Sequence, residues 1–177
     1  MIEIDVTEMG TIEQVVDLWQ KSLPSLDTEA FEIHLKLYQV NLIADRLYND
    51  IADDFSLSDV DVSILMLVSR NQRGRPVRPT DLGRSLRIKA SAITYRLDQL
   101  QELGFIERTL DGNDRRAVGV KVTEVGLTVV NEIVLRFNRK TAERLAAVVG
   151  DGGNIADLRQ HLDRLVKAWT SPDAALK

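Results

Sequence analysis

Apolar residues recur at intervals of three and four along most of the chain, which is the spacing of amphipathic helices. A short helix is predicted for residues 11–22, and Pro24 stops it. After Asp27, a second apolar stripe continues as far as Phe55 and predicts one long helix. The first third of the chain is therefore expected to consist mainly of two helices.

The middle of the chain breaks this pattern into shorter elements. Ser58, with Asp61 as its capping-box partner, predicts the start of a largely buried helix that ends near Arg70. Two prolines and a glycine make residues 73–79 a loop, because a helix does not continue through them. Thr80 is then expected to cap the next helix.

Two helices at close spacing follow this loop. They are predicted for residues 81–86 and 90–103, with a tight turn at residues 87–89 between them and Gly104 as the C-terminal cap. This spacing is typical of a helix-turn-helix, whose second helix enters the major groove of DNA.

From Phe105 the apolar period changes to two, which predicts a β-hairpin with a polar turn at residues 111–114. A hairpin directly after a recognition helix is a wing. Its basic residues Arg115 and Arg116 are placed to reach a minor groove or phosphates. The alternative is a surface hairpin with solvated arginines.

Two more helices are predicted, one from Thr123 and one after a glycine-rich break at residues 150–153. Their apolar stripes, like those of residues 11–57, need a partner. A second copy of the chain is the simplest partner that can bury these stripes. A twofold dimer also places two recognition helices about 34 Å apart, which is one turn of DNA. The alternative is that these helices close a monomeric core.

The fold class expected is mostly α, with a winged helix-turn-helix DNA-binding lobe and N- and C-terminal helices that form a dimerisation region. We expect a single domain over residues 1–177. Residues 58–122 form the lobe, and residues 11–57 and 123–170 form the dimerisation helices.

Charge is distributed unevenly along the 177 residues. The formal net charge is −4, but residues 70–121 hold twelve basic and six acidic residues, so that segment is +6 and the remainder −10. A basic segment in an acidic frame concentrates attraction for DNA on one surface. The segment therefore agrees with the predicted helix-turn-helix and wing.

Composition excludes several other classes. The chain has no cysteine, so disulfides, thiolate metal sites and thiol-based sensing are excluded. Its apolar runs fall far short of the roughly 20 residues of a membrane span, and no signal-peptide pattern opens it, so we expect a cytoplasmic protein without membrane contact. His34 and His161 are its two histidines and lack a catalytic or metal-binding context.

We therefore expect no enzyme activity and no cofactor. A second reading of the fold is a winged helix used for protein–protein contact or dimerisation, without DNA binding.

Over about residues 28–169 the sequence resembles the MarR family of regulators. The resemblance rests on residues 81–86, 93–100, 103–108, 114–116 and 122–126. It implies a homodimer that binds a palindromic operator in double-stranded DNA, acts as a repressor, and is released by a small aromatic or anionic ligand. The DNA contacts it implies fall on Arg87, Lys89, Ala90, Ser91, Ala92, Thr94 and Tyr95, and on Arg115 and Arg116 of the wing.

The family's wing usually has an aspartate two residues before the groove-reaching arginine. Here Asn113 occupies that place before Arg115, and Asp114 is the expected substitute.

The leading helix resembles that of the urate-responsive MarR subfamily. Trp19, Arg70 and Arg96 match its ligand-binding residues, while Ser63 stands where an aspartate is usual. This implies an effector that is a small aromatic acid or purine-like molecule, held by stacking on Trp19 and by the arginines. The alternative is that Trp19 belongs to the dimer core and that both arginines form structural ion pairs.

Overall fold

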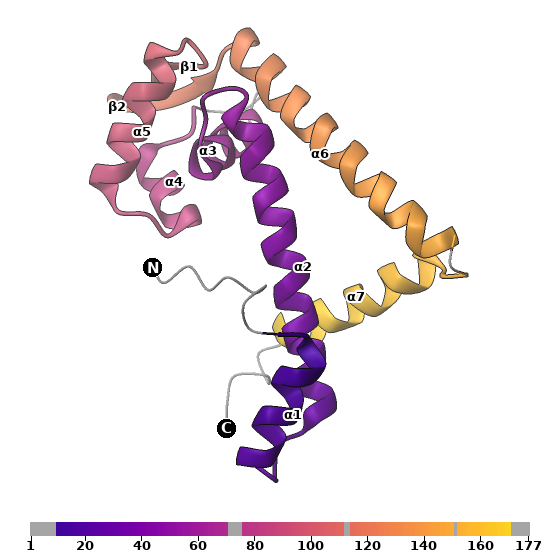
Figure 1. Ribbon diagram of the computed structural model, residues 1–177. Helices are drawn as coiled ribbons and strands as arrows, with labels where there is room; N and C mark the ends of the chain where they lie inside the picture. The colour runs from indigo at the N-terminus through magenta and orange to yellow at the C-terminus, as the bar shows by residue number, and fades with distance from the viewer. Residues whose placement is uncertain (1–9, 71–75, 112–113, 151, 171–177) are drawn as a thin grey trace.

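The computed structural model describes residues 10–70, 76–111, 114–150 and 152–170, with the backbone alone for residues 111 and 114–117 (Figure 1). Within these residues the chain forms seven helices and one two-stranded sheet. In chain order they are α1 Ile12–Ser22, α2 Thr28–Asp53, α3 Asp59–Ser69, α4 Pro79–Leu86, α5 Ala90–Glu102, β1 Ile106–Asp111, β2 Asp114–Val122, α6 Glu124–Gly150 and α7 Ile155–Thr170.

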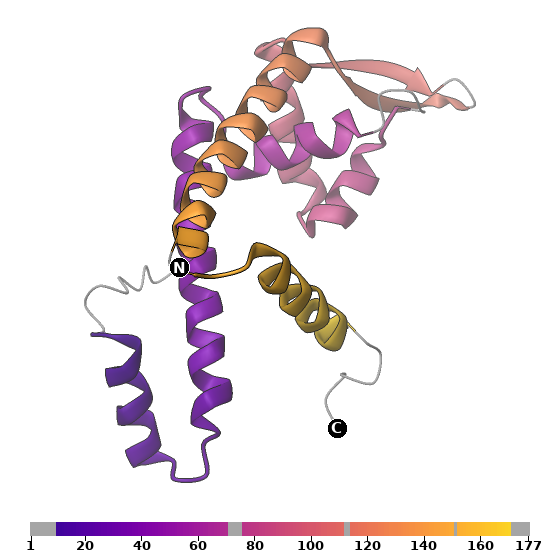
Figure 2. The same cartoon turned by 90° about the vertical axis from the view of Figure 1, so that its right-hand side faces the viewer.

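The first two helices form a hairpin. Thr11 and Gln14 make a capping box at the start of α1, and the carboxylate of Asp27 accepts a hydrogen bond from the Ala30 N–H at the start of α2. Between them the chain turns at Pro24, as the sequence predicts. Figure 2 shows α1 running alongside the N-terminal part of α2, away from α3, α4, α5 and the sheet.

The buried core lies in the lobe formed by α3, α4, α5 and the sheet. Ile93, Leu97 and Leu100 lie on one face of α5 and are fully buried. They join apolar residues of α3 and Leu82 of α4 in one cluster. Intervals of four and three residues put these side chains on the same face of a helix. The opposite face of α5 is thereby left at the surface.

The start of α4 differs from the sequence prediction. Arg78 is the N-cap residue and Pro79 is the first helical residue, so the prediction that Thr80 caps this helix is wrong. Proline suits the first helical position because its φ angle is preset and its missing N–H would have no partner there. The fixed backbone of Pro79 therefore starts the helix one residue before the threonine, with the N-cap two residues before it.

The predicted hairpin is present, with a longer second strand than expected. β1 and β2 pair antiparallel, with Ile106 opposite Val122 and Leu110 opposite Val118. Val77 makes a further bridge to Val120, with backbone N···O distances of 3.0 and 2.9 Å. The segment before α4 is thus joined to the base of the wing.

The last two helices leave the lobe. Thr123 caps α6, with its hydroxyl accepting a hydrogen bond from the Gly126 N–H. Gly126 packs directly against the Phe105 carbonyl, where a Cβ atom would clash. α6 extends away from the lobe and α7 turns back from its far end (Figure 1). None of the residues of α7 is buried in the single chain.

Candidate nucleic-acid interface

The turn between α4 and α5 has the geometry of a helix-turn-helix. Arg87 adopts a left-handed conformation with φ of 56°, and the Ile88 N–H donates to the Gly83 carbonyl at 2.9 Å. A Cβ at position 83 would lie 3.1 Å from the Ile88 carbonyl oxygen, so glycine permits this close approach. Lys89 is the N-cap residue of α5. The turn therefore brings two basic residues to the start of the predicted recognition helix.

The outer face of α5 carries the residues predicted to contact DNA. All seven of those before and on this helix are exposed: Arg87, Lys89, Ala90, Ser91, Ala92, Thr94 and Tyr95. The hydroxyl of Thr94 donates to the Ala90 carbonyl at 3.1 Å, and the Tyr95 hydroxyl accepts a hydrogen bond from Gln99 at 3.0 Å. Tyr95 is 60% exposed. On this exposed face lie small residues, hydroxyl groups and one cation, Lys89.

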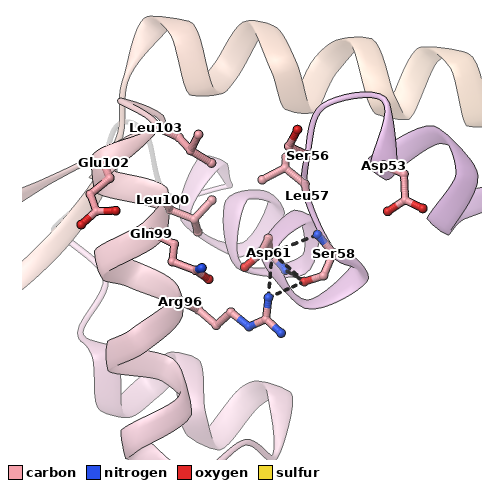
Figure 3. Close-up of a pocket in the computed structure, with 10 residues that line it drawn as sticks. All are labelled: Asp53, Ser56, Leu57, Ser58, Asp61, Arg96, Gln99, Leu100, Glu102 and Leu103. Carbon is pink, nitrogen blue, oxygen red and sulfur yellow. Dashed lines mark hydrogen bonds and ion pairs between the residues drawn. The ribbon is translucent and has the colours of Figure 1, made fainter.

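An ion pair joins α5 to the start of α3 (Figure 3). One guanidinium nitrogen of Arg96 lies 3.0 Å from Asp61 Oδ2 and 3.0 Å from Ser58 Oγ. Asp61 is 6% exposed, and the same Oδ2 also accepts from the Ser58 N–H and hydroxyl at 2.9 and 2.6 Å. The capping box of α3 and the recognition helix therefore share one carboxylate.

This ion pair lines a pocket of about 510 Å³ between α5 and the turn from α2 to α3. Asp53, Glu102 and Gln99 lie around it together with Asp61 and Arg96 (Figure 3). The second carboxylate oxygen of Asp61 is buried and has no hydrogen-bond partner among the described residues. A buried carboxylate is stabilised by the charge and donors that it contacts, so Arg96 contributes to holding Asp61 in place.

The wing is attached to α5 by a second ion pair. A guanidinium nitrogen of Arg108 on β1 lies 2.6 Å from Asp98 Oδ1 on α5. The backbone of Arg115 and Arg116 belongs to β2. Their side chains, and that of Asp114 as the expected partner of Arg115, lie outside the described residues.

A third set of contacts joins the lobe to the long helices. The ring of Tyr48 on α2 packs edge-to-face against Phe137 on α6, with 5.5 Å between centroids. The Tyr48 hydroxyl donates to the sulfur of Met66 on α3 at 3.3 Å. Burial raises the pKa of the Tyr48 hydroxyl, and the negative charge of Asp59 raises it further. Tyr48 therefore stays neutral and fixes α2 against both α3 and α6.

The residues expected to hold an effector lie in different parts of the chain. Trp19 packs edge-to-face on Phe31 in the α1–α2 hairpin, with 6.4 Å between centroids. Ser63 is half-buried on α3, and Arg96 lines the pocket beside Asp61. Arg70 is exposed at the end of α3, where it lines a separate cleft of about 750 Å³.

The sequence offers a structural ion pair of Arg96 as the alternative to a ligand role, but it does not identify Asp61 as the partner. The pair of Arg108 with Asp98 was missed altogether. The sequence predicts Asp61 as the capping partner of Ser58, and the structure confirms that role. The capping box gives no signal for a further partner 35 residues along the chain. The charges of Asp98 and Arg108 were visible in the sequence. Their pairing depends on how the wing folds back onto α5.

The described residues hold neither a metal-binding cluster nor a membrane-spanning helix. No group of three or more histidine or acidic side chains there is arranged to hold a metal ion. None of the helices in the same residues combines the length and the apolar character of a membrane span.

Comparisons with known proteins agree with this geometry. Residues 55–117 match the sequence model of the MarR family. The HTH-type transcriptional regulator PecS of Dickeya dadantii (strain 3937) is 28% identical over 123 residues, which cover 70% of this chain and 74% of PecS. The multiple antibiotic resistance protein MarR of Escherichia coli (strain K12) is 27% identical over 112 residues, which cover 63% of this chain and 76% of that protein.

Solved structures share the fold. The apo form of wild-type MarR from E. coli superposes with a TM-score of 0.61 at 23% identity, over 78% of this chain and 96% of that one. The YusO protein of Bacillus subtilis gives a TM-score of 0.63 at 18% identity, over 83% of this chain and 99% of that one. The MarR family comprises transcriptional regulators and not enzymes, in agreement with the sequence. Residues 55–117 are thus similar in sequence to the MarR family, and the chain shares the fold of solved MarR structures.

Proposed function

We propose that this protein is a sequence-specific DNA-binding transcriptional regulator that acts as a homodimeric repressor. The observation that carries the proposal is the division of α5 into two faces. Ile93, Leu97 and Leu100 bury one face completely, while Lys89 to Ala92 and Tyr95 expose the other. A rigid helix with a free polar face, followed by a wing, fits a major groove and the phosphates beside it.

The exposed side chains of this surface are assigned three kinds of DNA contact. Arg87 and Lys89 precede α5 and bind phosphates, which positions the helix without reading sequence. Ser91, Thr94 and Tyr95 supply hydroxyl groups for base edges. Arg115 and Arg116 of the wing extend the contact to the minor groove.

The dimer buries apolar surface that a single chain leaves exposed. α7 exposes Leu158, Leu162 and Trp169 by 37%, 43% and 63%, and α2 exposes Ile33 and Ile43 by about half. A second copy covers such stripes with a twofold axis, so each recognition helix meets one half of a palindromic operator.

We assign the response to an effector to Arg96, because it lies on the recognition helix and also lines a pocket. A small aromatic or anionic ligand that binds its guanidinium competes with Asp61 for it. The ligand shifts the protein away from DNA if it binds the form that does not fit the operator more tightly. The likeness to the urate-responsive subfamily supports a planar, purine-like or aromatic acid.

The test is the binding of labelled duplex DNA, measured by fluorescence anisotropy at several salt concentrations. We expect log K to fall linearly with log salt, and Lys89→Ala to reduce that slope by about 1. Lys140→Ala, an exposed lysine on α6, removes the same charge and should leave the slope unchanged. Failure of the parent protein to bind any duplex at low salt would favour the protein–protein contact module instead.

A further inference from the structure

A second basic surface lies beside the predicted recognition helix. The cleft of about 750 Å³ at the end of α3 is lined by Arg70, Arg78 and Arg84, with Thr80, Asp81 and Ser85 between them. They come from the end of α3, the segment before α4, and α4 itself. The fold therefore brings together three arginines from segments separated in sequence, against one acidic residue.

Two of these arginines are available to a ligand. Arg70 is exposed, and none of the interactions of the described residues involves its side chain. Arg84 has an 81% exposed side chain and a pair with Asp81 at 3.4 Å. An exposed pair of this length contributes little free energy, so an incoming anion displaces Asp81 at small cost.

The cleft suits a phosphate of DNA better than a small effector. Pockets for small molecules are mostly apolar and enclose most of the ligand. Here six of the ten lining residues are polar or charged, and Arg70 and Arg84 stand exposed at its border. Thr80 and Ser85 add hydroxyl donors, which suit phosphate oxygens.

The cleft is also continuous with the proposed DNA surface. Arg84 and Ser85 lie in the last turn of α4, directly before Arg87 and the start of α5. In a helix-turn-helix the first helix crosses the DNA backbone while the second enters the groove. Phosphates next to the contacted groove therefore pass along α4.

We propose that Arg70 and Arg84 bind the phosphate backbone of the operator, so that Arg70 acts on DNA and not on the effector. The inference rests on the proposed function. It adds a binding surface outside α5 and the wing that contributes affinity and salt dependence without reading sequence.

The experiment measures the salt dependence of duplex binding for Arg70→Gln, Arg84→Gln and the double variant. Each single substitution should reduce the slope of log K against log salt by about 1, and the double variant by about 2. Arg139→Gln, an exposed arginine on α6, is the matched control and should leave the slope unchanged. Unchanged thermal unfolding of the variants shows that the loss is local.

The outcomes separate this inference from the proposed function. If the parent protein binds no duplex, the proposed function fails. If the parent binds and the double variant has the same salt slope as Arg139→Gln, the cleft does not contact phosphates. The proposal of DNA binding itself is then unaffected. If the double variant binds DNA normally but loses stabilisation by benzoate in a thermal-shift assay, the cleft is an effector site and the proposal is overturned.

Discussion

The lobe of residues 58–122 and the long helices on either side of it bury their apolar residues differently. In the lobe, Ile64, Leu65 and Leu97 are completely buried within one chain. In α7, by contrast, Leu162 is 43% and Trp169 63% exposed. The core of the lobe is therefore complete in a single copy, whereas the flanking helices leave apolar side chains exposed, which in the proposed dimer a second copy covers.

The largest expected effect is in the core of the lobe. Leu97→Ala should lower the free energy of unfolding by about 3 kcal/mol, because it removes a fully buried side chain and leaves a cavity. Urea unfolding at low protein concentration measures it. Leu162→Ala is the matched substitution on α7, and we expect a loss below about 1 kcal/mol for the dissociated chain. Equal losses would contradict the difference between the two regions.

The second prediction concerns the exposed apolar surface of α7. Trp169→Asp should weaken dimerisation about 100-fold, or about 2.7 kcal/mol, because tryptophans are frequent centres of binding energy in interfaces. Sedimentation of the variant over a range of concentrations measures this, with Lys167→Ala on the same helix as control. A dimer as tight as the parent's would show that α7 lies outside the interface.

The third prediction concerns Asp61, whose carboxylate is shared by the capping box of α3 and by Arg96 on α5. Asp61→Ala should cost roughly 2 kcal/mol of stability, since it removes the capping interaction of α3 and the partner of Arg96. Thermal unfolding measures the loss. Asp59→Ala removes an exposed acidic residue from the same turn, and an equal loss there would mean that the capping contact and the ion pair together contribute nothing.

The smallest effect is expected at the wing. A double-mutant cycle of Arg108→Ala and Asp98→Ala should give a coupling energy of about 0.5 kcal/mol, because half-exposed pairs are weakened by solvent. A coupling of several kcal/mol would contradict this, because it would mean that the Arg108–Asp98 pair holds the wing to α5 as strongly as the Asp61–Arg96 pair holds α3 to α5.

Local patterns in the sequence predicted the element boundaries well. The capping box of Ser58 and Asp61, the turn at residues 87–89 and the left-handed Gly104 after α5 all follow from local backbone chemistry. The exceptions are the start of β2, which lies earlier than predicted, and the start of α4. There Thr80 and Pro79 are both good residues for a helix N-terminus, and the preset φ of Pro79 decided between them.

Contacts between distant segments were not predictable in the same way. The pairing of Asp61 with Arg96 and the bridge from Val77 to Val120 depend on how α3, α5 and the wing pack together. The family resemblance placed Arg70 and Arg96 in one effector site, whereas the structure places them along different pockets. Identity of residues at matching positions does not fix the direction in which long side chains extend.

The central claim is that the exposed face of α5 reads operator DNA twice in a symmetric dimer. Selection of bound sequences from a library of random duplexes tests it most directly, with the parent protein and Tyr95→Ala compared. The account predicts a palindromic site with half-sites about 10 base pairs apart, and a changed preference at one position in each half-site for the variant. Enrichment of no sequence, or of the same site by both proteins with equal discrimination, would contradict it.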